Sequence, residues 1–406
     1  MLEVGIDWGQ KSPNAFAILA ENGKIVKKGS VQRSAEGAQQ IIEQIKELET
    51  DPQQVRIGID RKNDILPHIL CSEGYVVYPL NPLSADRARD IYYPAGNKDD
   101  RVDAEVHARM VRNSWRNLRA LRLDDDKDRE IRSLLRNRNN LVDMRAQNKQ
   151  RLGSVLAEAS PNISGLCENL RLQWVKDFLR KWPLGQDFAE VHGNTLNAFL
   201  RKHPRISEAT KRQICSVHKQ PCCQHQPRSA ECYRLEIHTL LQLIASLQQQ
   251  IEVLEEKIKD LAAEHPDKAI FSSLPTDSDN TVAAFCTAFG PDRDEPYGWR
   301  NYSAYYGMSP ITEESGKNKQ VKMRLAYEKT IHKALLDFAD SMRRQEDCWA
   351  YDYYKRKKEQ GKGHYHALRC LGTRWVKILH AMWRNRTEYD EAFHRRNRAG
   401  RGAAAA

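Results

Sequence analysis

The feature that most constrains the fold is a heptad repeat in the second half of the chain. Isoleucine recurs every seven residues, and a leucine follows each isoleucine three residues later: Ile237, Ile244, Ile251 and Ile258, with Leu240, Leu247, Leu254 and Leu261. The pattern predicts a long helix with one apolar seam, and alternating isoleucine and leucine favours a parallel two-stranded coiled coil. We therefore expect a dimer through this helix. The alternative is a helical pair within one chain.

A second long helix is expected over residues 126 to 159, where apolar residues share one face and Arg and Asn the other. It could pair antiparallel with the heptad helix. The chain has 406 residues, enough for two or three domains. We expect an α/β domain over residues 1–120, a helical and coiled-coil region over 121–265, a mostly helical domain over 266–395, and a disordered tail over 396–406. Within the third region, helices are expected near 276–290, 296–306, 324–345 and 365–384.

The first domain has the pattern of a mixed sheet, so the fold class is α/β followed by all-α. Three short strands are expected within residues 2–31, and a turn at Glu21-Asn22-Gly23 joins the last two as a hairpin. A helix within residues 35–49 follows. The segments "VRIGID" and "YVVYPL" then read as buried strands separated by a helix over residues 65–71.

Four aspartates are placed to meet at one edge of this sheet. Asp7 and Asp60 each close a strand of the form apolar-Gly-Ile-Asp, and Asp100 and Asp103 share one face at the start of an expected helix. Carboxylates so close repel one another unless a cation compensates them. One or two Mg²⁺ ions suit oxygen ligands and can act on a phosphodiester, as in nucleases. The alternative is ordinary helix capping, which we expect of neighbouring Asp99.

A second candidate metal site lies in a Cys/His-rich insert. It contains Cys215, His218, Cys222, Cys223, His225 and Cys232. Thiolate and imidazole are the ligands that zinc prefers. The spacing differs from recognised zinc motifs, however, so reduced cysteines in a basic loop are the favoured interpretation and zinc the less favoured one.

The overall charge points to a polyanionic partner. The formal net charge is +11, and segments such as "VRNSWRNLRALR" interleave cations with aromatics, which is typical of nucleic-acid binding. The sequence has neither a run of 18 apolar residues nor a signal peptide at its N-terminus. We therefore expect a cytoplasmic protein without a membrane partner.

Three N-terminal motifs, "VGIDWG", "IGIDRK" and "KDDRVDA", resemble the ribonuclease-H-like (RuvC-like) domain of the DEDD transposases of the IS110 ("IS one-ten") insertion-sequence group. Their order and spacing match across residues 1 to about 115. The resemblance implies that Asp7, Asp60, Asp100 and Asp103 are catalytic Mg²⁺ ligands. The family usually has Glu where this chain has Asp60, which is one methylene shorter, and Asp64 is a weaker alternative ligand.

The segment "NYSAYYGMSPITEESGKNKQVKMR" resembles the C-terminal transposase domain of the same family, in which Gly-x-x-Pro precedes Ser-Gly-Lys. The resemblance implies that Ser315 attacks a DNA phosphodiester and forms a covalent phosphoserine. A serine needs activation, which the aspartate cluster is expected to supply. Cations after the serine are expected to bind nucleic acid and to stabilise charge at phosphorus: Lys317, Lys319, Lys322 and Arg324. The motifs "LPTDSD" and "LAYEKTIHKAL" depart from the family pattern.

The chain is therefore expected to be an enzyme, a DNA transposase and recombinase of an insertion sequence. The resemblance further implies donor and target DNA as substrates, a noncoding bridge RNA that pairs with both, a dimer or tetramer, and association with a bacterial nucleoid. Two alternatives stay open: a metal-dependent endonuclease of the Holliday-junction type, which uses water as nucleophile, and a non-catalytic nucleic-acid-binding scaffold.

Overall fold

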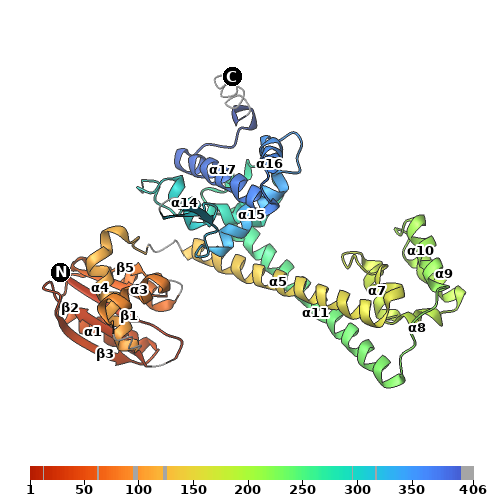
Figure 1. The fold of residues 1–406 in the computed structure, drawn as a ribbon, viewed down its shortest axis with the longest axis horizontal. Coiled ribbons are helices and arrows are strands. Elements are labelled where there is room, and N and C mark those ends of the chain that lie inside the picture. Colours follow the sequence, from red (N-terminus) through yellow and green to blue (C-terminus); the bar gives the residue numbers. More distant parts are fainter. Residues whose placement is uncertain are drawn as a thin grey trace. The chain divides into compact units, whose positions relative to one another are not determined.

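The computed structural model describes residues 1–11, 13–61, 64–94, 99–121, 126–294, 296–315 and 318–394. The chain divides into two compact units, residues 1–124 and residues 125–406, drawn in Figure 1. Each unit has its own hydrophobic cores. None of the helices in the described ranges is long and apolar enough to span a membrane.

The N-terminal unit is built on a five-stranded mixed sheet in the order β3-β2-β1-β4-β5. The strands are β1 (Leu2–Asp7), β2 (Asn14–Leu19), β3 (Ile25–Val31), β4 (Val55–Ile59) and β5 (Val76–Pro79). The first three pair antiparallel, whereas β4 runs parallel to both β1 and β5. Gly23 takes a φ of 79° in the turn before β3, a conformation that costs glycine little. The predicted mixed sheet with an antiparallel start is confirmed.

Helices cover both faces of this sheet. They are α1 (Ala35–Lys46), α2 (Ile65–Ser72), α3 (Pro82–Tyr92) and α4 (Asp100–Ser114), with short 3-10 turns at Pro52–Gln54 and Trp115–Asn117. Side chains alternate between faces along a strand. Val4 and Ile6 accordingly join the core beneath α1 and α2, while the intervening Gly5 faces α4.

Two glycines let α4 lie directly on the sheet. A Cβ at Gly5 would overlap the carbonyl oxygen of Ala104 and the amide nitrogen of Ala108. At Gly58 a Cβ would lie 2.6 Å from the Val111 side chain and 2.9 Å from the carbonyl oxygen of His107. The glycine in each Gly-Ile-Asp motif therefore sets the distance between α4 and strands β1 and β4.

The second unit contains the two long helices, α5 (Asp126–Ala159) and α11 (Pro227–Ala263), which pack side by side (Figure 1). Cross-pairs along their length show that they run antiparallel: Lys127 with Glu264 at 2.7 Å, Arg138 with Glu255 at 2.6 Å, and Arg151 with Glu236 at 2.7 Å. The four seam isoleucines are buried in this arrangement. Within the chain, the heptad helix α11 therefore pairs antiparallel with α5, as the alternative interpretation expected. Dimerisation through this helix stays a prediction.

A group of small helices closes one end of the long pair. It comprises α6 (Pro161–Ser164), α7 (Gln173–Lys181), α8 (Gly185–Ala189), α9 (Gly193–Lys202) and α10 (Glu208–His218). Its core unites these helices with the C-terminal part of α5 and the N-terminal part of α11. Phe178, Trp182, Phe188 and Phe199 meet there mostly edge to face, an arrangement that aromatic rings prefer.

The C-terminal segment packs on the opposite end of the pair, where Ile131 and Ile258 join its core. It comprises α12 (Lys268–Ser272), α13 (Asp279–Cys286), α14 (Trp299–Tyr305), α15 (Lys329–Met342), α16 (Trp349–Glu359) and α17 (His364–Asn385), with an antiparallel hairpin of β6 (Ile311–Ser315) and β7 (Asn318–Lys322). Helices were expected near 276–290, 296–306, 324–345 and 365–384, and α13, α14, α15 and α17 lie within or at these ranges. Helix α16 and the hairpin were not expected. The expected disordered tail lies outside the described residues.

Candidate active site

The aspartates of the sheet edge come from two neighbouring parallel strands. Ile6 of β1 pairs with Ile59 of β4, so the residues that follow, Asp7 and Asp60, leave the sheet at the same edge. Helix α4, held close by Gly5 and Gly58, brings its first turn, which contains Asp100 and Asp103, to this edge. We call these four residues the aspartate cluster.

Electrostatics show that the four carboxylates interact. Burial, the largest cause, and the negative charges of Asp60, Asp100 and Asp103 together raise the pKa of Asp7 from 3.8 to about 7, while the positive charge of Arg61 acts in the opposite direction. Burial and like charges both disfavour an ionised carboxylate. Without a cation, Asp7 therefore holds a proton for much of the time at neutral pH.

Two members of the cluster differ in how their oxygens are satisfied. Asp60 has one carboxylate oxygen, Oδ1, that is buried and receives no hydrogen bond from any residue the structure describes. Asp103 is bound by the guanidinium of Arg89 at 2.7 Å, which also binds Asp86 at 2.7 Å. An unsatisfied buried oxygen is unusual and suits a ligand that is not part of the chain.

The neighbouring acids have ordinary structural roles. Asp99 caps α4, its side chain accepting a hydrogen bond from the amide of Arg101 at 3.2 Å, which confirms the predicted cap. Asp64, the alternative ligand, caps α2 through the amide of Ile65 and forms an ion pair with Arg33 at 2.6 Å. Both of its carboxylate oxygens are therefore already used.

The cluster fits Mg²⁺ by its chemistry, since carboxylate oxygens are the ligands this ion prefers and Asp60 offers a free one. Within the described ranges, however, no three His, Cys, Asp or Glu side chains converge closely enough to enclose a metal ion. Binding through Asp103 would also require that side chain to loosen its ion pair with Arg89. The four carboxylates lie near one another, but they do not form a closed coordination shell.

A histidine that sequence reasoning missed stands beside the cluster. His107 lies one helical turn after Asp103, is buried, and donates from Nδ1 to the carbonyl oxygen of Ile6 at 3.0 Å. Burial lowers the pKa of His107, although Asp60 and Asp103 act in the opposite direction. The hydrogen bond ties α4 to β1 one residue before Asp7. Its spacing of four from Asp103 was the available signal.

The pKa of Asp7 leads to a prediction about stability. A carboxyl whose pKa is higher in the folded than in the unfolded protein adds stability below pH 3.8, and this contribution is lost as the pH rises towards 7. We expect the metal-free protein to lose melting temperature over this interval relative to an Asp7→Asn variant, and Mg²⁺ to restore it near pH 7. Thermal unfolding at several pH values measures the difference. Parallel curves for the two proteins without Mg²⁺ would contradict it.

Ser315 lies in the second unit, at the end of β6, with its side chain exposed. It pairs across the hairpin with Asn318. Of the expected phosphate-binding cations, Lys322 forms an ion pair with Glu313 at 2.5 Å, and Arg324 is half-buried. Lys317 lies outside the described residues, as does the side chain of Lys319. The serine therefore projects from a solvent-exposed hairpin.

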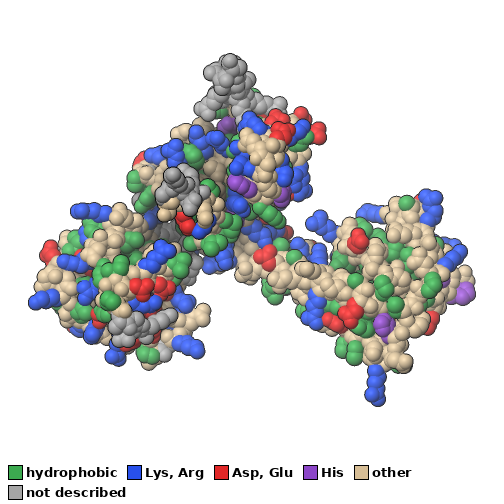
Figure 2. Space-filling model, viewed as in Figure 1, with side chains coloured by type: hydrophobic (Ala, Val, Ile, Leu, Met, Phe, Trp, Pro, Cys, Tyr) green, Lys and Arg blue, Asp and Glu red, His purple; other side chains and the backbone are tan. Residues whose placement is uncertain are grey.

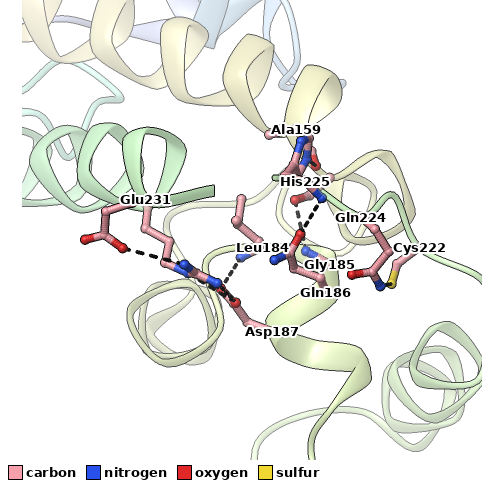
Figure 3. A network of polar contacts seen from close by, with 11 residues as sticks. Ala159, Leu184, Gly185, Gln186, Asp187, Cys222, Gln224, His225 and Glu231 are labelled. Carbon is pink, nitrogen blue, oxygen red and sulfur yellow. Dashed lines mark hydrogen bonds and ion pairs between the residues drawn. The ribbon is translucent and has the colours of Figure 1, made fainter. Parts of the chain in front are cut away.

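The Cys/His-rich insert does not gather its ligand-type side chains. His225 contacts the carbonyl oxygen of Ala159 through Nε2 at 2.7 Å, and the thiol of Cys222 accepts a hydrogen bond from Gln224 at 3.3 Å (Figure 3). His218 contacts the carbonyl oxygen of Val191 at 2.8 Å. Cys215, Cys222, Cys223 and Cys232 are free thiols. The two histidines thus have a structural role that needs no zinc.

Comparison with known proteins gives this arrangement its context. A family model described as "Transposase", for DEDD transposases of the IS110 type, matches residues 4–161 and so contains the whole aspartate cluster. A Streptomyces coelicolor protein described as a candidate transposase for the IS117 mini-circle is 23% identical over 95% of both chains. The chain is similar to transposases of the IS110 type, over residues 4–161 for the family model and over nearly its whole length for the IS117 relative.

Two further relatives are similar to this chain over part of its length. The "uncharacterized 43.6 kDa protein" of insertion element IS110, from Streptomyces coelicolor, is 24% identical over 78% of each chain. A candidate transposase of Sinorhizobium fredii is 27% identical over 49% of this chain and 56% of its own. The family model ends at residue 161, so the match covers the aspartate cluster and α5 but not Ser315.

Proposed function

We propose that this transposase cuts and rejoins DNA at the aspartate cluster with the help of Mg²⁺, and that Ser315 is the nucleophile. The observation that carries the proposal is geometric: the ends of β1 and β4 and the first turn of α4 bring four carboxylates from separate parts of the chain to one sheet edge. Burial and the charges of the other three carboxylates raise the pKa of Asp7 there, and perturbed carboxylates of this kind cluster at functional sites.

Each residue would have a distinct task. Asp7, Asp60, Asp100 and Asp103 would hold Mg²⁺, which supplies positive charge to the phosphate under attack. His107 fixes α4 against β1 and so keeps Asp103 near Asp7. The Ser315 oxygen would form a bond to phosphorus as the bond to a deoxyribose oxygen breaks, and the hydroxyl proton would pass to a base. Lys322 and Arg324, on or just after β7, would bind neighbouring phosphates.

The remaining assignments belong to the same proposal. The sheet would have a RuvC-like fold, and the domains would span residues 1–120, 121–265 and 266–395. The substrates would be donor and target DNA, paired with a noncoding bridge RNA. The protein would assemble as a dimer or tetramer through the heptad helix and associate with the bacterial nucleoid. The net charge of +11 supports a polyanionic partner. In Figure 2, Lys and Arg side chains are scattered over all parts of the visible surface, and Asp and Glu form smaller groups among them.

A covalent intermediate is the feature that separates this function from hydrolysis by water. Protein incubated with Mg²⁺ and DNA carrying the element's ends is expected to yield a protein–DNA adduct whose phosphate maps to Ser315 by mass spectrometry. Ser315→Ala should abolish the adduct and recombination. Thr312→Ala, which removes an exposed hydroxyl from the same strand, should retain both. Metal-dependent cutting that persists in Ser315→Ala would instead favour the endonuclease.

A further inference from the structure

A cavity of about 400 Å³ lies in the second unit, between one face of α5 and the segment that follows α6. From α5 it is lined by residues that include Lys149, Leu152 and Leu156, whose spacing of three and four places them on the same side of the helix. From the facing segment it is lined by residues that include Leu170 and Arg171. Leu152, Leu156 and Leu170 are buried, so the cavity has an apolar floor.

Cations surround this cavity. Lys149 and Arg171 line it, and Arg145 on α5 and Lys176 on α7 lie close enough to act on Lys149. Burial lowers the pKa of Lys149, and the positive charges of Arg145, Arg171 and Lys176 lower it further. Like charges held together in this way destabilise the protein unless an anion accompanies them. Glu168, the carboxylate in the lining, has an exposed side chain.

The pairing of charges along α5 makes this group unusual. Lys127, Arg138 and Arg151 each form an ion pair with a carboxylate on α11 or at its C-terminal cap. By contrast, Lys149 and Arg171 have no ion pair with any residue that the structure describes. Within the described part of the chain, these three cations of α5 are thus ion-paired, whereas Lys149 and Arg171 at the cavity are not.

We propose that this cavity binds a phosphate of a nucleic-acid strand, as a contact separate from the aspartate cluster and from the Ser315 hairpin. Lys149 and Arg171 are placed to hold the phosphate, and Arg is suited to bind two of its oxygens at once. The apolar floor and the volume provide room for part of the attached nucleoside. The proposal rests on the proposed function only in taking nucleic acid as the ligand.

The first test compares two double variants of the full-length protein. Lys149→Gln with Arg171→Gln removes two charges from the cavity, whereas Arg201→Gln with Lys202→Gln removes two exposed charges at the end of α9. Binding of a fluorescent single-stranded oligonucleotide is measured over a range of salt concentrations. We expect the cavity variant to bind about 10-fold more weakly at low salt, with a log K against log[salt] slope reduced by about 0.7, the value for one lost phosphate contact on a single strand. Equal behaviour of the two variants would overturn the proposal.

The second test needs no variant and so does not depend on how a variant folds. A lysine of lowered pKa is more often neutral and reacts faster with an amine acylating reagent, so Lys149 should be labelled early in the wild-type protein, as read by mass spectrometry. The oligonucleotide should protect Lys149 at a concentration where inorganic phosphate and a nucleoside monophosphate do not. Equal protection by free phosphate, or no protection by the strand, would overturn the assignment. Protection in Ser315→Ala and Asp7→Asn proteins would separate this site from the chemistry of the proposed function.

Discussion

Asp7→Asn is expected to lower the rate of DNA recombination by about 1,000-fold or more, because under the proposed function several kcal/mol of metal-assisted charge stabilisation would depend on this carboxylate. The same change should not destabilise the protein near neutral pH. It removes a half-buried carboxylate whose ionised form is destabilised by burial and by the charges of Asp60, Asp100 and Asp103. A variant that melts at the same or a higher temperature and yet cannot recombine DNA would show that stability and function conflict at this position.

The matched control is Asp99→Asn. Asp99 adjoins the cluster, but its side chain caps α4, and asparagine caps helices about as well as aspartate. Recombination is measured by polymerase chain reaction across the new junction, in cells that carry the element with its native flanking DNA. We expect Asp99→Asn to recombine at nearly the wild-type rate. Full activity in Asp7→Asn would rule out a catalytic role for the cluster and would favour the scaffold alternative.

Gly5→Ala is expected to have the largest effect on the fold of the N-terminal unit. Its Cβ would overlap backbone atoms of Ala104 and Ala108, and backbone in the middle of a helix cannot rotate away as a flexible side chain can. Forced overpacking of this kind typically costs 1–3 kcal/mol and occasionally more, so we expect about 3 kcal/mol. Relief requires α4 to move off the sheet, which also draws Asp100 and Asp103 away from Asp7 and Asp60. Recombination should therefore fall together with stability.

Gly9→Ala is the control in the same unit. A Cβ at Gly9 would find its nearest neighbour, the side-chain oxygen of Asn14, at 3.5 Å, an ordinary contact. Urea unfolding and hydrogen exchange of the β1 and α4 amides measure the two variants. We expect early exchange in α4 of Gly5→Ala and nearly unchanged values in Gly9→Ala. If Gly5→Ala were as stable as the wild-type protein, the close approach of α4 would not be a determinant of the site.

Much of the N-terminal unit could be predicted because its signals are local. A strand that ends in Asp7 and another that ends at Asp60 are recognisable from short apolar runs, and parallel neighbours place such ends at one edge. The cap at Asp99 follows from its position before a helix. His107 could not be identified with equal ease, because its role depends on the carbonyl oxygen of Ile6, about a hundred positions earlier in the chain.

The C-terminal hairpin shows a different limit. Strands β6 and β7 expose nearly all of the side chains described on them. Their sequences therefore lack the alternation of apolar and polar residues that would predict strands. Helix α16 was missed for a related reason. It is rich in charged and aromatic residues and buries only Trp349, Ala350 and Tyr353, which leaves a weak helical period. Segments with little buried surface leave little pattern in the sequence.

The sequence by itself determined where the long helices and the strands of the N-terminal sheet lie and which aspartates end at the sheet edge, because residue spacing follows the period of each element. Only the tertiary structure decided which partner covers the Ile237 to Ile258 seam, since a second chain and α5 would bury the same isoleucines. It also decided how near α4 comes to Gly5 and Gly58, and hence the raised pKa of Asp7. These properties depend on distances between segments that are remote in the chain, and the spacing of residues along the sequence does not determine those distances.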